Sequence, residues 1–290
     1  MEELNYRPNR IAQGLRLNKT YNIAFLISDI TNDFYTEIYK GIHETALTKG
    51  YLTSLSEIND SSDSLEILLN SRPDGIILGN SVSNKTLNKF KKANIPLVSI
   101  AAAGMQQYTI STLVDNYLAT QEAIDYLYKM GHRKIGFLSY NDRNRDRFKG
   151  YKDGLLKYEL EYNEKFIGLF KENNYHYHLG YKTMLKLLKK NNRSASLTAI
   201  IANNDLNAIG AIKAAREHGL KVPDDISFIS FDDSLAAQYC YPPLTTTKIL
   251  KYKQGEAVAG LLFDLIAGKD VNSIKLPTEI IIRDSVKKIN

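Results

Sequence analysis

The stretch that decides the fold is TAIIANNDLNAIGAIKAAREHGLKVPDDISFISFDD, residues 198–233. It opens with an apolar run at Thr198–Asn203, which is typical of a buried strand. Apolar residues then recur at helical spacing over 208–215 and stop before Gly219, where a glycine commonly ends a helix. A second apolar run follows at Ile226–Phe231. A helix between two continuous apolar strands predicts parallel strands that are buried on both faces.

The same alternation of strands and helices runs along the rest of the chain. Further strands are expected at Ile23–Ser28, Gly75–Gly79, Leu97–Ile100 and Ile135–Tyr140. Further helices are expected at Phe34–Lys49, Leu118–Met130, Phe148–Tyr158, His178–Lys190 and Gln254–Ala267. Two successive sets of such units predict the α/β class, with two lobes that are each a doubly wound parallel sheet.

The composition is that of an ordinary globular protein, with 43% hydrophobic and 24% charged residues among 290. No apolar run reaches the ~18–20 residues of a membrane span, and the first 20 residues lack the apolar core of a signal peptide. We therefore expect a cytoplasmic protein. The single cysteine, Cys240, excludes an internal disulfide and a cysteine metal cluster. The formal charge of +6 permits a polyanionic partner without establishing one.

No motif of an enzyme is found in the sequence. The dinucleotide-binding, phosphate-loop, zinc-protease and nucleophile-elbow patterns are missing. The five histidines are scattered, and the nearby pair His176 and His178 has no third ligand beside it. The sequence therefore predicts a protein that is not an enzyme and has neither a metal ion nor a cofactor.

Polar and aromatic residues gather immediately after the expected strands, where doubly wound sheets bind their ligands. These segments are residues 29–35, 101–104, 141–147, 203–205 and 232–233. A cleft between two lobes would bring them together, and we expect a small-molecule site there.

Several motifs, in the same order and at similar separations, resemble those of the LacI/GalR transcription regulators. They are Leu4–Asn9, Val114–Asn116, Gly131–Ile135, Asn204–Asp205, Ala208–Ala211, Gly219–Ser227, Phe231–Asp233, Pro242–Thr246 and Ile282–Ser285. The resemblance covers the whole chain. The sensing region of this family is similar to periplasmic sugar-binding proteins. The resemblance therefore implies the fold of type I periplasmic binding proteins.

The resemblance also implies a division of the chain. Residues 1–20 would be the remnant of a DNA-binding headpiece and its hinge helix, with most of the headpiece missing. Residues 21–115 and 247–276 would form the N-terminal lobe, and residues 116–246 and 277–290 the C-terminal lobe. Three crossovers would then join the lobes and permit them to close around a ligand.

By the same resemblance, five residues of the hinge contact operator DNA in the full-length protein, namely Arg7, Asn9, Arg10, Leu15 and Arg16. Leu15 stands where a leucine of the family inserts into a base step, and the arginines would contact phosphates. The alternative is a short arm without a fixed structure. The helices that read the major groove are not in this chain, so we expect no sequence-specific DNA binding by it alone, and a homodimer as its assembly.

The resemblance assigns effector-binding roles to polar residues after the strands. Arg147 offers a rigid fork of donors, Asp232 can accept hydrogen bonds from hydroxyl groups, and Asn204 can do both. Arg145 is a further donor, and Asp115 belongs either to the site or to a hinge. For each of these residues the alternative is an ordinary ion pair or helix cap.

Aromatic residues would complete the effector site. Phe34, Tyr35 and Tyr175 correspond to positions that line the ligand in relatives, although ordinary packing is the alternative for Tyr175. Where many relatives carry an aspartate after a strand, this chain has Ala101–Ala103. The identity of the effector therefore does not carry over.

The resulting hypothesis is a repressor of carbohydrate-utilisation genes that senses a sugar or sugar derivative by lobe closure. The alternative is a solute-binding protein of a transporter with the same fold. The hinge-like string at 4–16 and the lack of a signal peptide argue against that alternative.

Overall fold

The structure, a computed structural model, describes residues 17, 19–58, 62–100, 105, 108–140, 146–170, 177–190 and 197–289. The Arg7–Arg16 hinge residues, Ala101–Ala103, Arg145 and Tyr175 lie outside the described residues. The chain divides into two compact units, unit 1 (Met1–Leu113 and Lys251–Leu276) and unit 2 (Val114–Leu250 and Pro277–Asn290). The first division lies two residues before the expected boundary at 115, and the second lies four residues after the expected boundary at 246. The third coincides with the expected boundary at 276.

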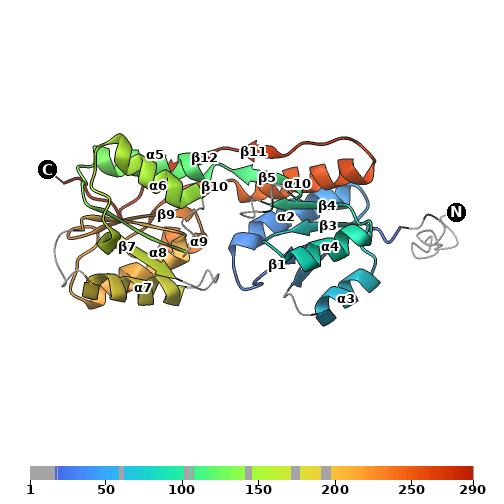
Figure 1. The fold of residues 1–290 in the computed structure, drawn as a ribbon, viewed down its shortest axis with the longest axis horizontal. Helices are drawn as coiled ribbons and strands as arrows, with labels where there is room; N and C mark the ends of the chain where they lie inside the picture. The colour runs from blue at the N-terminus through green and yellow to red at the C-terminus, as the bar shows by residue number, and fades with distance from the viewer. Residues whose placement is uncertain are drawn as a thin grey trace, which may run out of the picture. The chain divides into compact units, whose positions relative to one another are not determined.

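Unit 1 is built on a six-stranded sheet with the order β11-β5-β4-β3-β1-β2. The strands are β1 (Asn22–Ile27), β2 (Leu52–Glu57), β3 (Gly75–Leu78), β4 (Leu97–Ile100), β5 (Ile110–Val114) and β11 (Ile274–Leu276). Strands β1 to β5 pair in parallel. The helices are α2 (Phe34–Thr48), α3 (Ser62–Asn70), α4 (Asn84–Lys92) and α10 (Lys251–Ile266) (Figure 1).

Alternating residues of these strands point to opposite faces of the sheet and make two cores. Ile23 and Phe25 of β1 pack in one cluster with residues of α2 and α10. Ala24 and Leu26 pack in the other cluster, with residues of α3 and α4. Helices on both faces explain why these strands are continuously apolar.

Unit 2 repeats this plan, with the strand order β12-β10-β9-β8-β6-β7. Its strands are β6 (Ile135–Tyr140), β7 (Ile167–Phe170), β8 (Ala199–Ala202), β9 (Ser227–Asp232), β10 (Thr245–Ile249) and β12 (Thr278–Ile281). Its α-helices are α5 (Asn116–Lys129), α6 (Asp146–Lys157), α7 (Tyr177–Lys190), α8 (Asp205–Glu217) and α9 (Leu235–Tyr239), and Glu164–Phe166 forms a short 3-10 helix.

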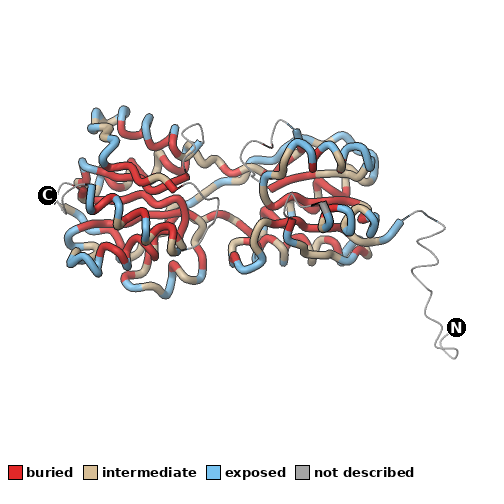
Figure 2. The backbone as a smooth tube through the Cα atoms, turned by 60° about the horizontal axis from the view of Figure 1, so that its bottom comes forward, coloured by how far each residue is buried: buried red, intermediate tan, exposed pale blue. Residues whose placement is uncertain are grey.

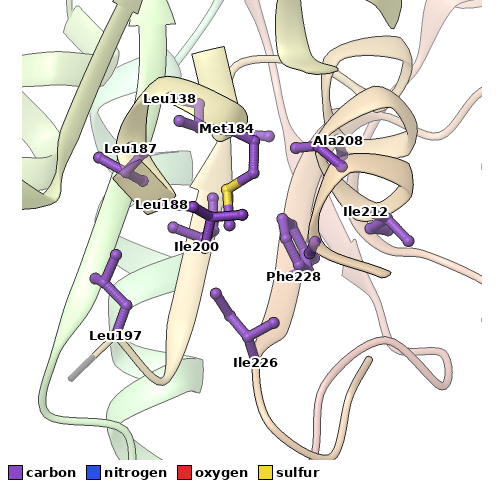
Figure 3. Packing of buried hydrophobic residues seen from close by; sticks show 14 of the residues in the cluster. Leu138, Met184, Leu187, Leu188, Leu197, Ile200, Ala208, Ile212, Ile226 and Phe228 are labelled. Carbon is purple, nitrogen blue, oxygen red and sulfur yellow. The ribbon is translucent and has the colours of Figure 1, made fainter. Parts of the chain in front are cut away.

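Two cores also cover the sheet of unit 2. Met184 of α7 and Ala208 of α8 pack with Ile200 and Phe228 on one face (Figure 3). Helices α5 and α6 pack on the other face, against a cluster that includes Phe137. Figure 2 shows buried segments in the interior of each unit, with exposed segments around them. The predicted α/β class with two doubly wound sheets is confirmed.

One strand departs from the all-parallel expectation. β12 pairs antiparallel with β10, with Thr246 opposite Ile281 and Ile249 opposite Thr278. An antiparallel strand at the edge of an otherwise parallel sheet is common in doubly wound folds. Within the described ranges, no helix is both long and apolar enough to span a membrane.

Candidate functional site

Arg147 lies in the first turn of α6, next to the carboxyl ends of the unit 2 strands. Its Nε donates a hydrogen bond to Asn116 Oδ1 at 2.9 Å, and its Nη1 donates to the carbonyl oxygen of Asn203, directly after β8. The guanidinium carbon is 4.1 Å from the ring centroid of Phe231 in β9. These contacts fix the plane of the guanidinium at the carboxyl edge of the sheet.

Asp232 ends β9 at the same edge, in a strained backbone conformation. Its φ is 111°, and the φ of Asp233 is 51°. Residues other than glycine rarely adopt such positive φ values. The Asp233 carboxylate accepts a hydrogen bond of 2.5 Å from Arg283 Nη2. Two successive left-handed residues turn the chain sharply and keep Asp232, which is partly exposed, at the edge.

Asp205 holds this turn from inside the protein. Its carboxylate is 1% exposed and accepts hydrogen bonds from Ser230 Oγ (2.5 Å), the Ser234 backbone N–H (2.6 Å) and Thr246 Oγ1 (2.7 Å). Burial raises the pKa of the Asp205 carboxyl, and the hydrogen bonds from these groups oppose that shift. Because Ser230 and Ser234 lie on either side of Asp232, this carboxylate fixes both ends of the turn.

Asn204 is the N-cap of α8. It is 2% exposed, and its Oδ1 accepts a hydrogen bond from the Asn207 N–H at 2.8 Å. The cap satisfies one of the unpaired N–H donors at the helix start. Helix capping is the alternative to an effector-binding role for Asn204. The neighbouring Asn203 supplies its carbonyl to Arg147 and accepts from Ser139 Oγ at 3.3 Å.

Asp115 caps α5 in the same way, because its Oδ1 accepts a hydrogen bond from the Leu118 N–H at 3.0 Å. The residue that follows, Asn116, is the partner of Arg147 Nε. Asp115 therefore fixes the start of α5, and Asn116 at that start holds Arg147 in place.

The aromatic candidates of unit 1 differ from each other in burial. Phe34 opens α2 and is half-buried, with its ring edge-on to Tyr35 at a centroid distance of 5.4 Å. Tyr35 is 4% exposed and packs on Phe25 in the core at a centroid distance of 6.1 Å. Phe34 reaches the surface of unit 1 at the carboxyl edge of its sheet, whereas Tyr35 is a core residue.

The structure thus brings Arg147, Asn204 and Asp232 to one edge of unit 2. It also shows groups at that edge to which the sequence assigned no individual role: Asn116, the Asn203 carbonyl, the Phe231 ring and the buried Asp205. A fixed guanidinium and a carboxylate suit a polar ligand with several hydroxyl groups. In the part of the chain that is described, no three histidine, cysteine, aspartate or glutamate side chains gather to hold a metal ion.

Comparison with known families and proteins identifies what the chain as a whole is similar to. The periplasmic binding protein-like domain matches residues 124–286. Catabolite control protein A of Priestia megaterium is 31% identical over 99% of this chain and 88% of its own length. The HTH-type transcriptional repressor PurR of Mannheimia succiniciproducens is 31% identical over 100% of this chain and 88% of its own length.

A solved structure with a similar fold is a LacI family transcriptional regulator from Enterococcus faecium with bound ribose. It superposes with a TM-score of 0.81 at 25% identity, over 93% of this chain and 100% of that one. The fold, the domain match and the similarity to regulators along nearly the whole chain all agree, and this chain belongs to the LacI family of transcription regulators.

Proposed function

We propose that this chain is the effector-sensing region of a transcriptional repressor, and that the carboxyl edge of the unit 2 sheet binds the effector. The observation that carries the proposal is the fixed position of Arg147, held by Asn116 and Asn203 and stacked on Phe231, at the edge that also presents Asp232. Doubly wound sheets bind ligands at this edge.

The chemistry of the edge favours a sugar or sugar derivative. A guanidinium donates to hydroxyl oxygens, and a carboxylate accepts from hydroxyl hydrogens, so the pair reads both polarities of a polyol. The ribose named with the Enterococcus faecium regulator belongs to this class of compound. From unit 1, Phe34 is the candidate that supplies an apolar surface for the effector. Arg145 and Tyr175 are further candidates by resemblance.

A regulator is favoured over a transporter's solute-binding protein or an enzyme. One of the two relatives is named as a transcriptional repressor and the other as a catabolite control protein, and both matches cover almost all of this chain. By family resemblance, Arg7, Asn9, Arg10, Leu15 and Arg16 would contact operator DNA in the full-length protein, and two copies would associate. Effector binding would alter operator affinity through the closure of the lobes, with a coupling of typically ~1–3 kcal/mol.

A thermal-shift screen tests the effector site. Monosaccharides, disaccharides, sugar phosphates and nucleosides are added to the parent chain, to Arg147→Ala and to Asp232→Ala. The matched control is Arg133→Ala, which removes a guanidinium that stacks on Tyr128 at 3.9 Å, just before β6 at the opposite edge of the same sheet. We expect at least one compound to stabilise the parent and the control but neither edge variant. A compound that stabilises both edge variants as well as the parent contradicts the site.

A further inference from the structure

In unit 1, the edge of the sheet at which the parallel strands begin lies opposite to the carboxyl edge of the same sheet. This edge carries more basic than acidic residues. We call this edge, residues 19–22, 48–52, 70–75, 91–97 and 267–274, the amino edge. Its exposed basic residues include Lys19, Lys49, Arg72, Lys91 and Lys92. Among the described residues none of these five forms an ion pair. The ammonium of Lys91 lies 5.8 Å from the Tyr108 ring centroid.

The acidic side chains near the amino edge are mostly engaged. Asp74 accepts hydrogen bonds from the Thr20 N–H (2.8 Å), Thr20 Oγ1 (2.9 Å) and the Tyr21 N–H (3.1 Å). Asp264 pairs with Lys269 at 2.7 Å. Within the amino edge the acids are Asp74 and Asp270, and the basic residues Lys19, Lys49, Arg72, Lys91, Lys92 and Lys269 outnumber them, so the net charge of the edge is positive.

The same contacts fix where the chain joins unit 1. The single hydroxyl hydrogen of Thr20 is shared between Asp74 and the Arg72 carbonyl oxygen, which lies 2.9 Å from Oγ1, so residues 20 and 21 are tied to the loop before β3. Figure 1 shows the chain entering unit 1 at the start of β1. Arg16, which we propose contacts DNA, precedes Lys19 by three residues, a span of at most ~11 Å.

Helix dipoles explain only part of this charge. Lys91 and Lys92 lie in the last turn of α4, and Lys49 is the C-cap of α2, positions that favour cations in any protein. Lys19 and Arg72 lie outside the helices, and they flank the point at which the chain enters unit 1.

We propose that the amino edge of unit 1 contacts the phosphate backbone of DNA next to the segment that residues 7–16 bind. The proposal rests on the proposed function, because it requires a chain whose preceding segment lies on DNA. These contacts would add affinity without base specificity, since lysine and arginine neutralise phosphates of any sequence. The edge would act as a second, salt-sensitive contact surface beside the operator-binding segment.

The test is the binding of the 290-residue chain to a fluorescein-labelled duplex of arbitrary sequence, measured by anisotropy between about 50 and 200 mM KCl. The edge variant carries Arg72→Gln, Lys91→Gln and Lys92→Gln. The control variant carries Lys129→Gln, Lys134→Gln and Lys189→Gln, three exposed lysines of unit 2, and changes the net charge equally.

We expect the edge variant to bind at least about tenfold more weakly at 50 mM KCl, and its salt slope to fall by about 2–3. The control variant should stay within about threefold of the parent. Equal weakening of both variants, an unchanged edge variant, or a parent chain that does not bind the duplex at 50 mM KCl overturns the proposal. The effector screen uses no DNA, so failure of the sensing function is read separately from failure of this contact.

Discussion

The guanidinium carbon of Arg147 lies 4.1 Å from the ring centroid of Phe231, so that a residue of α6 is stacked on a residue of β9. The two positions are 84 residues apart in the chain. The stack holds a cationic donor group against the sheet edge that also carries Asp232. Its flat geometry is specific to arginine, because a lysine ammonium has neither the plane nor the fork of donors.

Arg147→Lys is therefore expected to lose most of the response to the effector. The charge is kept, but the stack on Phe231, of the order of 0.5–2 kcal/mol, and the double hydrogen bonding to Asn116 and Asn203 are lost. Titration calorimetry with the strongest compound of the screen measures the loss of affinity. Arg133→Lys, which changes the analogous stack on Tyr128, should bind as the parent does. Equal affinities of parent and Arg147→Lys would show that the guanidinium does not contact the effector.

Asp232→Gly is expected to separate stability from function. The left-handed φ of 111° costs about 1 kcal/mol or more for a residue with a side chain, and glycine removes that cost. We expect a higher melting temperature together with loss of the effector response. Glu159→Gly relieves a φ of 52° far along the chain and should stabilise without affecting the response. An Asp232→Gly variant that still responds fully would remove Asp232 from the site.

Packing of α2 against α10 depends on Gly41. A methyl group at this position would meet the carbonyl oxygen of Tyr252, and backbone cannot move aside cheaply. We expect Gly41→Ala to lower the free energy of unfolding by about 1–3 kcal/mol, measured by urea denaturation. Gly260→Ala in α10 has open space around the new methyl group, and should be neutral or stabilising by up to about 1 kcal/mol. A neutral Gly41→Ala would contradict the close helix contact.

His132 makes the stability of unit 2 depend on pH. The ring is 1% exposed, its Nε2 is 3.1 Å from the Lys287 carbonyl oxygen, and burial lowers its pKa below the ordinary 6.5. Because the pKa is lower in the folded chain, protonation of His132 favours the unfolded chain. The full stability of the folded chain is therefore present above pH 6.5, and part of it is lost as the pH falls below 6.5. Urea denaturation at about pH 7.5 and pH 5 should show a larger loss for the parent than for His132→Gln. Identical losses would contradict this assignment.

Much of the fold follows from hydrophobic pattern alone. β4 and β6 have the bounds expected from their apolar runs, because strands covered on both faces are buried along nearly their whole length. β2 was not predicted, since Leu52–Glu57 is a partly exposed edge strand without a continuous apolar run. The short α4 was missed for a similar reason, because NKTLNKFKK buries only Thr86, Leu87 and Phe90.

The candidate site could be predicted only in outline. That polar residues follow the strands is visible in the sequence, and the fold rule places them at one edge. The partners of Arg147 are not visible, because Asn116 and the Asn203 carbonyl lie 31 and 56 residues away. Asp205 has the usual appearance of an acid in the first turn of a helix, and only the folded sheet shows that it is buried under β9 and β10.

The most direct test of the central claim is hydrogen–deuterium exchange of the chain with and without the strongest stabilising compound. We predict that the compound slows exchange of the backbone amides around residues 146–148, 203–207 and 231–234, at the carboxyl edge of the unit 2 sheet. Protection confined to other segments, with these three unchanged, would contradict the claim that this edge binds the effector.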